Sequence, residues 1–132
     1  MALAHHNLVV WQRADDLFIE LHLLTRQRFP GFERFELGSQ VRRAAYSVPA
    51  NLVEGIARTH PRESLRFFDM ASSSLSEVGY GIHAATRLGY FNVDESNALE
   101  AKVRLVAAPL KGLVARYQAG GRLQRARQLG TD

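Results

Sequence analysis

The 132-residue sequence predicts an all-α protein, an antiparallel four-helix bundle with up-down-up-down topology. Three observations lead to this fold class. Apolar residues recur every three or four positions in four separate segments, strand-like alternation of apolar and polar residues is absent, and the segments are joined by short turns. Short connections place consecutive helices side by side in opposite directions, because they leave no room for a crossover.

The first helix is expected over residues 8–29. Its apolar face is formed by Val10, Ala14, Leu17, Leu21 and Leu24. The proline and glycine at positions 30 and 31 end this helix, because proline removes a backbone donor and glycine lets the backbone turn.

The second helix is expected to begin between residues 33 and 37 and to end near Ala57. It carries two stripes of opposite character at helical spacing. The apolar stripe comprises Leu37, Val41, Ala44, Ala45, Val48, Leu52 and Ile56, and the polar stripe comprises Gln40, Arg43, Ser47, Asn51, Glu54 and Arg58. Pro49 lies inside this helix, and we expect a kink there rather than a break, because both stripes continue in phase across it.

The third helix is expected from Pro61 to about Leu88, with proline at its first position. Its buried face comprises Phe67, Phe68, Ala71, Leu75, Val78, Ile82 and Ala85. Small residues punctuate this helix and favour the close approach of another helix.

The fourth helix is expected to begin after Asp94, which can cap it. Its apolar seam comprises Leu99, Val103, Val106, Leu110, Leu113 and Tyr117. Pro109 should kink this helix as Pro49 kinks the second. Residues 1–119 are thus expected to form one domain, and residues 120–132, with Arg122, Arg125 and Arg127 but little apolar content, a basic disordered tail.

Composition narrows the class of protein. Basic residues number 17 against 13 acidic ones, and all of them except Lys102 and Lys111 are arginine. Arginine binds phosphate and carboxylate bidentately, which suits nucleic acid or interface ion pairs, although a GC-rich genome would produce the same bias. The sequence has no cysteine, no signal-peptide pattern and no apolar run of membrane-spanning length. We therefore expect a cytoplasmic protein that does not enter a membrane.

Motifs for catalysis are absent from the sequence. A di-iron bundle needs Glu-x-x-His pairs, and the chain has none. Neither a Gly-x-Ser-x-Gly elbow nor a glycine-rich phosphate loop after a strand occurs. We expect no metal, no cofactor and no enzymatic activity.

Two sets of polar residues on the second and third helices remain as candidate sites. For Gln40, Arg43, Ser47, Asn51 and Glu54 we favour a buried or half-buried polar network, within the bundle or between subunits, over a solvated face. The second set is Arg42, Arg43, Arg58, Arg62 and Arg66. A phosphate-binding patch and simple ion pairing with Glu54, Glu63 and Asp69 explain it equally well.

Several motifs give the chain a more specific likeness. They are Val10-Trp11-Gln12, Phe29-Pro30, Glu33, Leu37, Gln40, the run RRAAYSVPANLVEG from Arg42 to Gly55, Ser74-x-x-Glu77 and Leu88-Gly89-Tyr90. Together they resemble the four-helix-bundle proteins encoded in intervening sequences of bacterial large-subunit ribosomal RNA genes, over about residues 8–118. The chain departs at Leu52-Val53, where that family often has Ile-Ala, and at Ser73-Ser74, where Gly-Ser is common.

The resemblance implies a cytoplasmic, non-enzymatic bundle that assembles as a ring of five. It also implies relatives among the accessory proteins of diversity-generating retroelements, which are similar five-fold barrels with a basic surface that bind nucleic acid and a reverse transcriptase. We therefore expect a homopentamer that binds structured RNA or DNA through its arginines. The alternative is an oligomeric scaffold that recruits a protein partner without touching nucleic acid directly.

Overall fold

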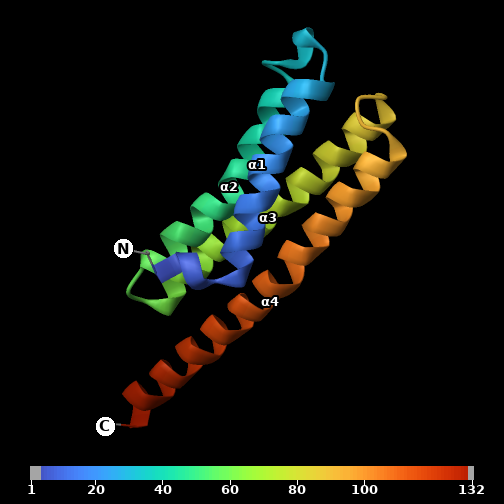
Figure 1. Cartoon of the computed structure of the whole chain (residues 1–132). Coiled ribbons are helices and arrows are strands. Elements are labelled where there is room, and N and C mark those ends of the chain that lie inside the picture. Colours follow the sequence, from blue (N-terminus) through green and yellow to red (C-terminus); the bar gives the residue numbers. More distant parts are fainter. Residues whose placement is uncertain (1–3, 131–132) are drawn as a thin grey trace.

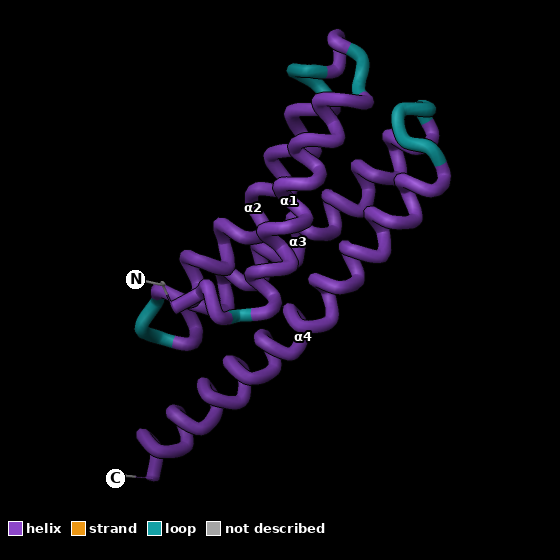
Figure 2. The backbone as a smooth tube through the Cα atoms, viewed as in Figure 1, coloured by secondary structure: helices purple, strands orange, loops and turns teal. Residues whose placement is uncertain are grey.

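The computed structural model describes the backbone of residues 4–130 and the side chains of residues 5–121. The helices are α1 (Val9–Arg28), α2 (Leu37–Ala57), α3 (Pro61–Arg87) and α4 (Val93–Gly130), with short 3-10 turns η1 (Ala4–Asn7) and η2 (Gly31–Glu33). Figure 2 shows helices joined by brief loops, and no strand occurs in residues 4–130. The predicted all-α class and its helices are confirmed.

The helices pack in a closed order around one core. Each helix contacts the next along the chain, α4 also contacts α1, and the contact between α2 and α3 is the most extensive. Figure 1 shows the chain running to one end of the molecule along α1 and back along α2, then repeating this along α3 and α4. The α1–α2 and α3–α4 turns consequently lie at one end, and the α2–α3 turn lies at the other.

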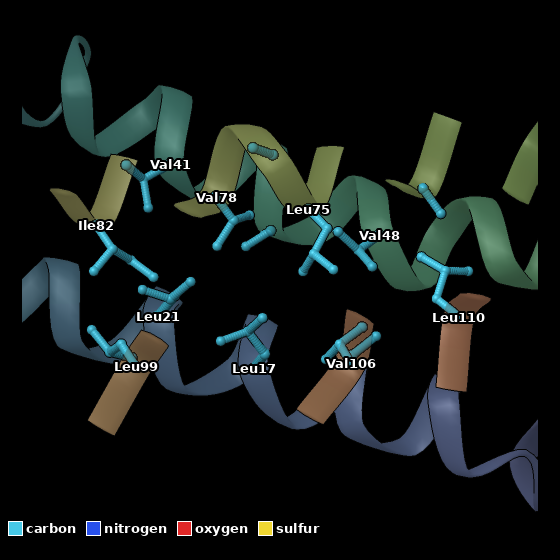
Figure 3. Close-up of a cluster of buried hydrophobic side chains, with 14 of the residues drawn as sticks. Leu17, Leu21, Val41, Val48, Leu75, Val78, Ile82, Leu99, Val106 and Leu110 are labelled. Carbon is cyan, nitrogen blue, oxygen red and sulfur yellow. The ribbon is translucent and has the colours of Figure 1, made fainter. Parts of the chain in front are cut away.

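Apolar side chains from all four helices meet between them. Figure 3 shows Leu17 and Leu21 of α1, Val41 and Val48 of α2, Leu75, Val78 and Ile82 of α3, and Leu99, Val106 and Leu110 of α4 gathered in this core. The helical spacing of apolar residues predicts each of these positions. Leu37 and Ile56, near the two ends of the apolar stripe on α2, are only partly buried.

Both internal prolines lie within continuous helices. α2 passes through Pro49 and α4 passes through Pro109 without interruption, so a split of the second helix is excluded. The kinks at these residues stay predictions. α4 also differs from the expected length, because it continues through Gly120 and Gly121 to Gly130 instead of ending near residue 119. The side chains of Arg122, Arg125 and Arg127 lie outside the described residues, and the disordered tail stays a prediction.

The cap of α4 is Asn92, and the expectation that Asp94 caps it is wrong. Asn92 Oδ1 accepts a hydrogen bond from the Glu95 N–H at 2.8 Å, and Glu95 Oε1 accepts one from the Asn92 N–H at 3.0 Å. This reciprocal pair of hydrogen bonds is a capping box. A capping box joins the residue that directly precedes the helix, here Asn92, to the third residue of the helix, here Glu95. Arg28 Nε, at the end of α1, donates to Glu95 Oε2 at 2.6 Å. The cap thereby joins α4 to α1.

The Glu95 contacts predict a pH-dependent contribution to stability. The Asn92 N–H, followed by the Arg28 guanidinium, lowers the pKa of the Glu95 carboxyl in the folded protein. A lowered folded pKa stabilises the protein above the unfolded pKa, and this contribution disappears as pH falls through the folded pKa. We expect Glu95→Gln to lower the urea midpoint at pH 7 and to match the wild type at strongly acidic pH.

The control for this experiment is Asp94→Asn, which removes a carboxylate from the same helical turn at an exposed position. It should lower the urea midpoint at pH 7 by less than Glu95→Gln does, because it loses only the favourable interaction of a first-turn carboxylate with the helix dipole and no side-chain hydrogen bond to a described residue. If the urea midpoints of Glu95→Gln and the wild type differ by the same amount at pH 7 and at acidic pH, the ionised Glu95 carboxylate is not the cause of the difference.

Candidate nucleic-acid interface

The five predicted phosphate-binding arginines do not form one patch. Arg42 and Arg43 lie near the start of α2, and Arg58 directly follows its end. At 1.5 Å per residue, the helix separates Arg43 from Arg58 by roughly 22 Å along its axis. Only Arg58, Arg62 and Arg66 gather at the α2–α3 turn, and we call these three the turn arginines.

The turn arginines differ in how they are engaged. Arg58 Nη2 lies 2.9 Å from Glu54 Oε2, and its guanidinium stacks over the Phe67 ring at 4.7 Å. Arg62 and Arg66 are exposed and form no ion pair with any described residue. The ion-pairing interpretation thus holds for Arg58, while Arg62 and Arg66 keep their charges available.

A shallow pocket of about 250 Å³ opens beside Arg58 and Arg66, and Arg62 is not part of its lining. It is lined by Arg58, Glu63, Arg66, Phe67 and Met70. Guanidinium groups beside an aromatic ring can contact a phosphate and stack on a base in one place. This arrangement suits an unpaired nucleotide, such as one in a loop or bulge of a structured nucleic acid.

Arg42, in contrast, is a structural residue. Its half-buried guanidinium donates through Nη1 to Thr25 Oγ1 at 3.3 Å and through Nη2 to the Arg34 carbonyl oxygen at 2.8 Å. These bonds hold the end of α1 and the α1–α2 turn against α2. Arg43, its neighbour, is exposed and has no hydrogen bond or ion pair with a described residue.

This contrast predicts unequal effects of substitution at neighbouring positions. We expect Arg42→Gln to lower the free energy of unfolding by about 1–3 kcal/mol, because hydrogen bonds from a charged donor are lost. Arg43→Gln, which makes the same chemical change on the exposed side, should stay within about 0.5 kcal/mol of the wild type. Urea titration of the two variants tests this, and equal destabilisation would refute the structural role of Arg42.

The polar stripe of α2 divides into a half-buried part and an exposed part. Asn51 Nδ2 donates to the carbonyl oxygen and to Oγ of Ser47, both at 2.8 Å, and Ser74 Oγ of α3 donates to Ser47 Oγ at 2.8 Å. Ser47, Asn51 and Ser74 therefore form a network between α2 and α3. Gln40, Arg43 and Glu54 are exposed and stand outside it.

A groove follows the outer side of the α2–α3 contact, and we call it the α2/α3 groove. Two adjoining pockets of about 510 and 470 Å³ form it and share Gln40, Ala44 and Glu77. Phe35 lines one pocket and Tyr80 the other, and these aromatic residues are 84% and 71% exposed. An amphipathic groove with exposed aromatic residues has the composition of a protein interface.

Glu33 and Tyr90 form a contact that sequence reasoning did not find. Glu33 is buried in η2, and its Oε2 accepts a hydrogen bond from the Tyr90 hydroxyl at 2.8 Å. This bond to a carboxylate raises the pKa of the Tyr90 phenol. Both residues belong to the motifs of the resemblance, yet no helical spacing relates them, because they lie in separate turns.

Among the described residues, no three histidine, cysteine or carboxylate side chains lie close enough together to hold a metal ion. Within the same part of the chain, no helix has the length and apolar character needed to cross a membrane.

Comparison with known proteins identifies similar chains. Residues 6–112 match the model of the family described as 23S rRNA-intervening sequence protein. A crystal structure of a protein of unknown function from the S23 ribosomal protein family of Bacteroides thetaiotaomicron has a TM-score of 0.75 at 15% sequence identity, covering 80% of this chain and 98% of that one. At this identity the likeness shows the fold alone. No curated protein matches the chain.

Proposed function

The chain belongs to the 23S rRNA-intervening sequence protein family, and we propose that it is a cytoplasmic, non-enzymatic accessory protein that binds structured RNA or DNA as a homopentamer. The observation that carries the nucleic-acid part is the group of turn arginines. Arg62 and Arg66 are exposed with no ion pair among the described residues, and Arg58 stacks on Phe67 beside them.

Charge supports this proposal at two scales. The whole chain has a formal net charge of +4 and a pI near 10.0, so it attracts polyanions at neutral pH. Locally, the fork of a guanidinium group matches the oxygens of a phosphate, and unpaired arginines can bind phosphate without first breaking an ion pair. Arg42 acts mainly through its internal hydrogen bonds, and Arg43 lines the α2/α3 groove, so the phosphate contacts are assigned to the turn arginines.

A filter-binding titration against structured RNA and duplex DNA tests nucleic-acid binding. With about four phosphates neutralised, the association constant should fall roughly 100-fold between 50 and 200 mM salt. Binding to neither nucleic acid at low salt would overturn the proposal. If the association constant does not change with salt concentration, arginine–phosphate contacts do not produce the binding.

The α2/α3 groove supports an interface between subunits, and the number of five subunits comes from the family resemblance alone. The exposed Phe35 and Tyr80 side chains, together with Arg43 and Glu77, offer apolar area and both signs of charge on one face. We expect light scattering at micromolar concentration to give five times the chain mass of 14.8 kDa. A monomer mass would contradict oligomerisation altogether.

A substitution locates the interface within the oligomer. Tyr80→Glu introduces a charge at the groove and should reduce the mass measured by light scattering, because a buried unpaired charge is costly. Leu105→Glu makes a comparable change at an exposed position on α4 and should leave the assembly intact. If both variants keep the full mass, the groove is not the subunit interface.

The alternative function is a scaffold that recruits a protein partner. It is favoured by exposed apolar side chains at the end of the molecule that carries the α1–α2 and α3–α4 turns, among them Phe32 at 75% exposure and Leu88 at 57%. Pull-down from extract before and after nuclease treatment separates the two functions. A defined partner that survives nuclease supports the scaffold, and partners lost on treatment support nucleic-acid binding.

A further inference from the structure

A second basic site lies at the opposite end of α2 from the turn arginines. A pocket of about 480 Å³ opens where the end of α1 and the α1–α2 turn meet α2. It is lined by His22, Thr25, Arg26, Phe29, Pro30, Gly31, Arg34 and Arg42. We call it the arginine pocket, because Arg26, Arg34 and Arg42 each approach it from a different segment.

The charge of the arginine pocket is uncompensated. Its lining contains no carboxylate, and neither Arg26, Arg34 nor Arg42 forms an ion pair with a described residue. The pocket beside Arg58 and Arg66, in contrast, includes Glu63, and Arg58 there is paired with Glu54. Three like charges around one hollow repel each other, and a bound anion removes this repulsion.

Arg42 gives the pocket a fixed guanidinium group. Its bonds to Thr25 Oγ1 and to the Arg34 carbonyl oxygen use Nη1 and Nη2 and set the orientation of the group. A guanidinium has five N–H donors, so others remain for a ligand. Arg26 and Arg34 are exposed and can close on a ligand from two sides. A preoriented donor loses less conformational entropy when the ligand binds.

The helix dipole does not account for this arrangement. Arg26 lies in the last turn of α1, where a positive charge is favourable by itself. Arg34 follows η2 and Arg42 lies in α2, so neither belongs to the end of α1. Arg42 is placed by its hydrogen bonds to Thr25 and Arg34, and the Arg34 guanidinium lies over the Phe35 ring at 5.4 Å. What points to an anionic ligand is the presence of three arginines and no carboxylate in one lining.

We propose that the arginine pocket binds a phosphate group, supplied either by nucleic acid or by a free phosphate compound. Several guanidinium groups around one hollow match the charge and the tetrahedral oxygens of a phosphate better than those of a single carboxylate. The pocket volume lies within the range of small-ligand sites, and the Phe29 ring provides an apolar wall for the group that the phosphate carries. For a nucleic-acid phosphate, this role rests on the proposed function.

The test uses the full chain and inorganic pyrophosphate as the probe. Calorimetric titration at constant ionic strength, with chloride as the reference salt, should show saturable binding of one pyrophosphate per chain. Arg26→Gln with Arg34→Gln should weaken this binding roughly 10- to 100-fold, because hydrogen bonds between charged groups are lost. Both side chains are exposed and donate no hydrogen bond to another described residue, so the double variant should fold.

The matched control removes two charges from exposed positions on α4, as Arg104→Gln with Arg116→Gln. It should leave pyrophosphate affinity within about twofold of the wild type, since net charge alone acts weakly at constant ionic strength. If the wild type shows no saturable binding of pyrophosphate, the proposal that the arginine pocket binds phosphate is refuted. Equal weakening of pyrophosphate binding in both double variants also refutes it.

Filter binding with the same variants identifies the source of the phosphate. If RNA affinity falls further in the pocket variant than in the control, the phosphate belongs to nucleic acid. If RNA affinity is equal in the two while pyrophosphate binding differs, the pocket binds a free phosphate compound. If the wild type binds RNA but not pyrophosphate, the phosphate site in the arginine pocket is refuted and the proposed function is unaffected. If the wild type binds pyrophosphate but not RNA, the proposed function is refuted and the phosphate site is unaffected.

Discussion

Phe68→Ala is expected to lower the free energy of unfolding by about 3–5 kcal/mol, the usual loss for a buried phenylalanine. Phe68 on α3 is 0% exposed. Its ring packs edge to face on Tyr117 of α4 at 4.8 Å between centroids. On the other side it covers Gly55 of α2, where a Cβ would lie only 2.5 Å from Phe68 Cε1. One side chain thus joins three helices, and its loss removes contacts that the surroundings cannot refill.

Urea unfolding at a fixed protein concentration measures this loss. Phe32→Ala is the matched control, because it deletes the same group at a side chain that is 75% exposed. It should change the free energy of unfolding by less than about 0.5 kcal/mol. A Phe68→Ala loss below about 1 kcal/mol would mean that α2, α3 and α4 do not meet at this residue.

Combined replacement of the turn arginines is expected to weaken RNA binding roughly 100-fold. The variant is Arg58→Gln, Arg62→Gln and Arg66→Gln together, and each lost phosphate contact should cost about 1 kcal/mol. The slope of log affinity against log salt should become shallower by about two to three, because fewer counterions are released on binding. Filter binding across a salt series measures both quantities.

The control for that variant removes three charges elsewhere, as Arg87→Gln, Arg104→Gln and Arg116→Gln, all at exposed positions. It separates the loss of a particular surface from the loss of net charge. If the two triple variants weaken RNA binding equally, the turn arginines are not the binding surface. An unchanged salt slope in the first variant would exclude them as phosphate contacts.

The sequence-based prediction of helices succeeded where the signal was local. Val10, Ala14, Leu17 and Leu21 lie on one face of α1 because the helical period alone brings them together. The start of α3 was likewise found from Pro61, whose fixed backbone angle suits a first helical position. The cap of α4 was misassigned because asparagine and aspartate both cap helices, and only the Glu95 side chain distinguishes them.

The candidate sites were predicted less well than the helices. The type of a charged residue does not show whether its side chain is exposed or is held by hydrogen bonds to another segment. Arg42 and Arg43 are adjacent and identical in type, yet one is held inside by hydrogen bonds and the other faces outward. The half-buried network includes Ser74, which the polar stripe of α2 could not reveal. The positions of Arg43 and Arg58 at opposite ends of the expected helix were visible in the sequence, but the partners of each arginine were not.

The sequence by itself determined the fold class, the four helices and the face of each helix that enters the core. These follow from the spacing of apolar residues within single helices, and burial of apolar surface is the main force that drives folding. Only the tertiary structure decided which polar groups meet. Glu33 with Tyr90, Arg42 with Thr25 and Ser47 with Ser74 come from separate segments, and a hydrogen bond requires its two atoms within about 3.5 Å. Such distances are set by the packing of whole helices rather than by any pattern along one of them.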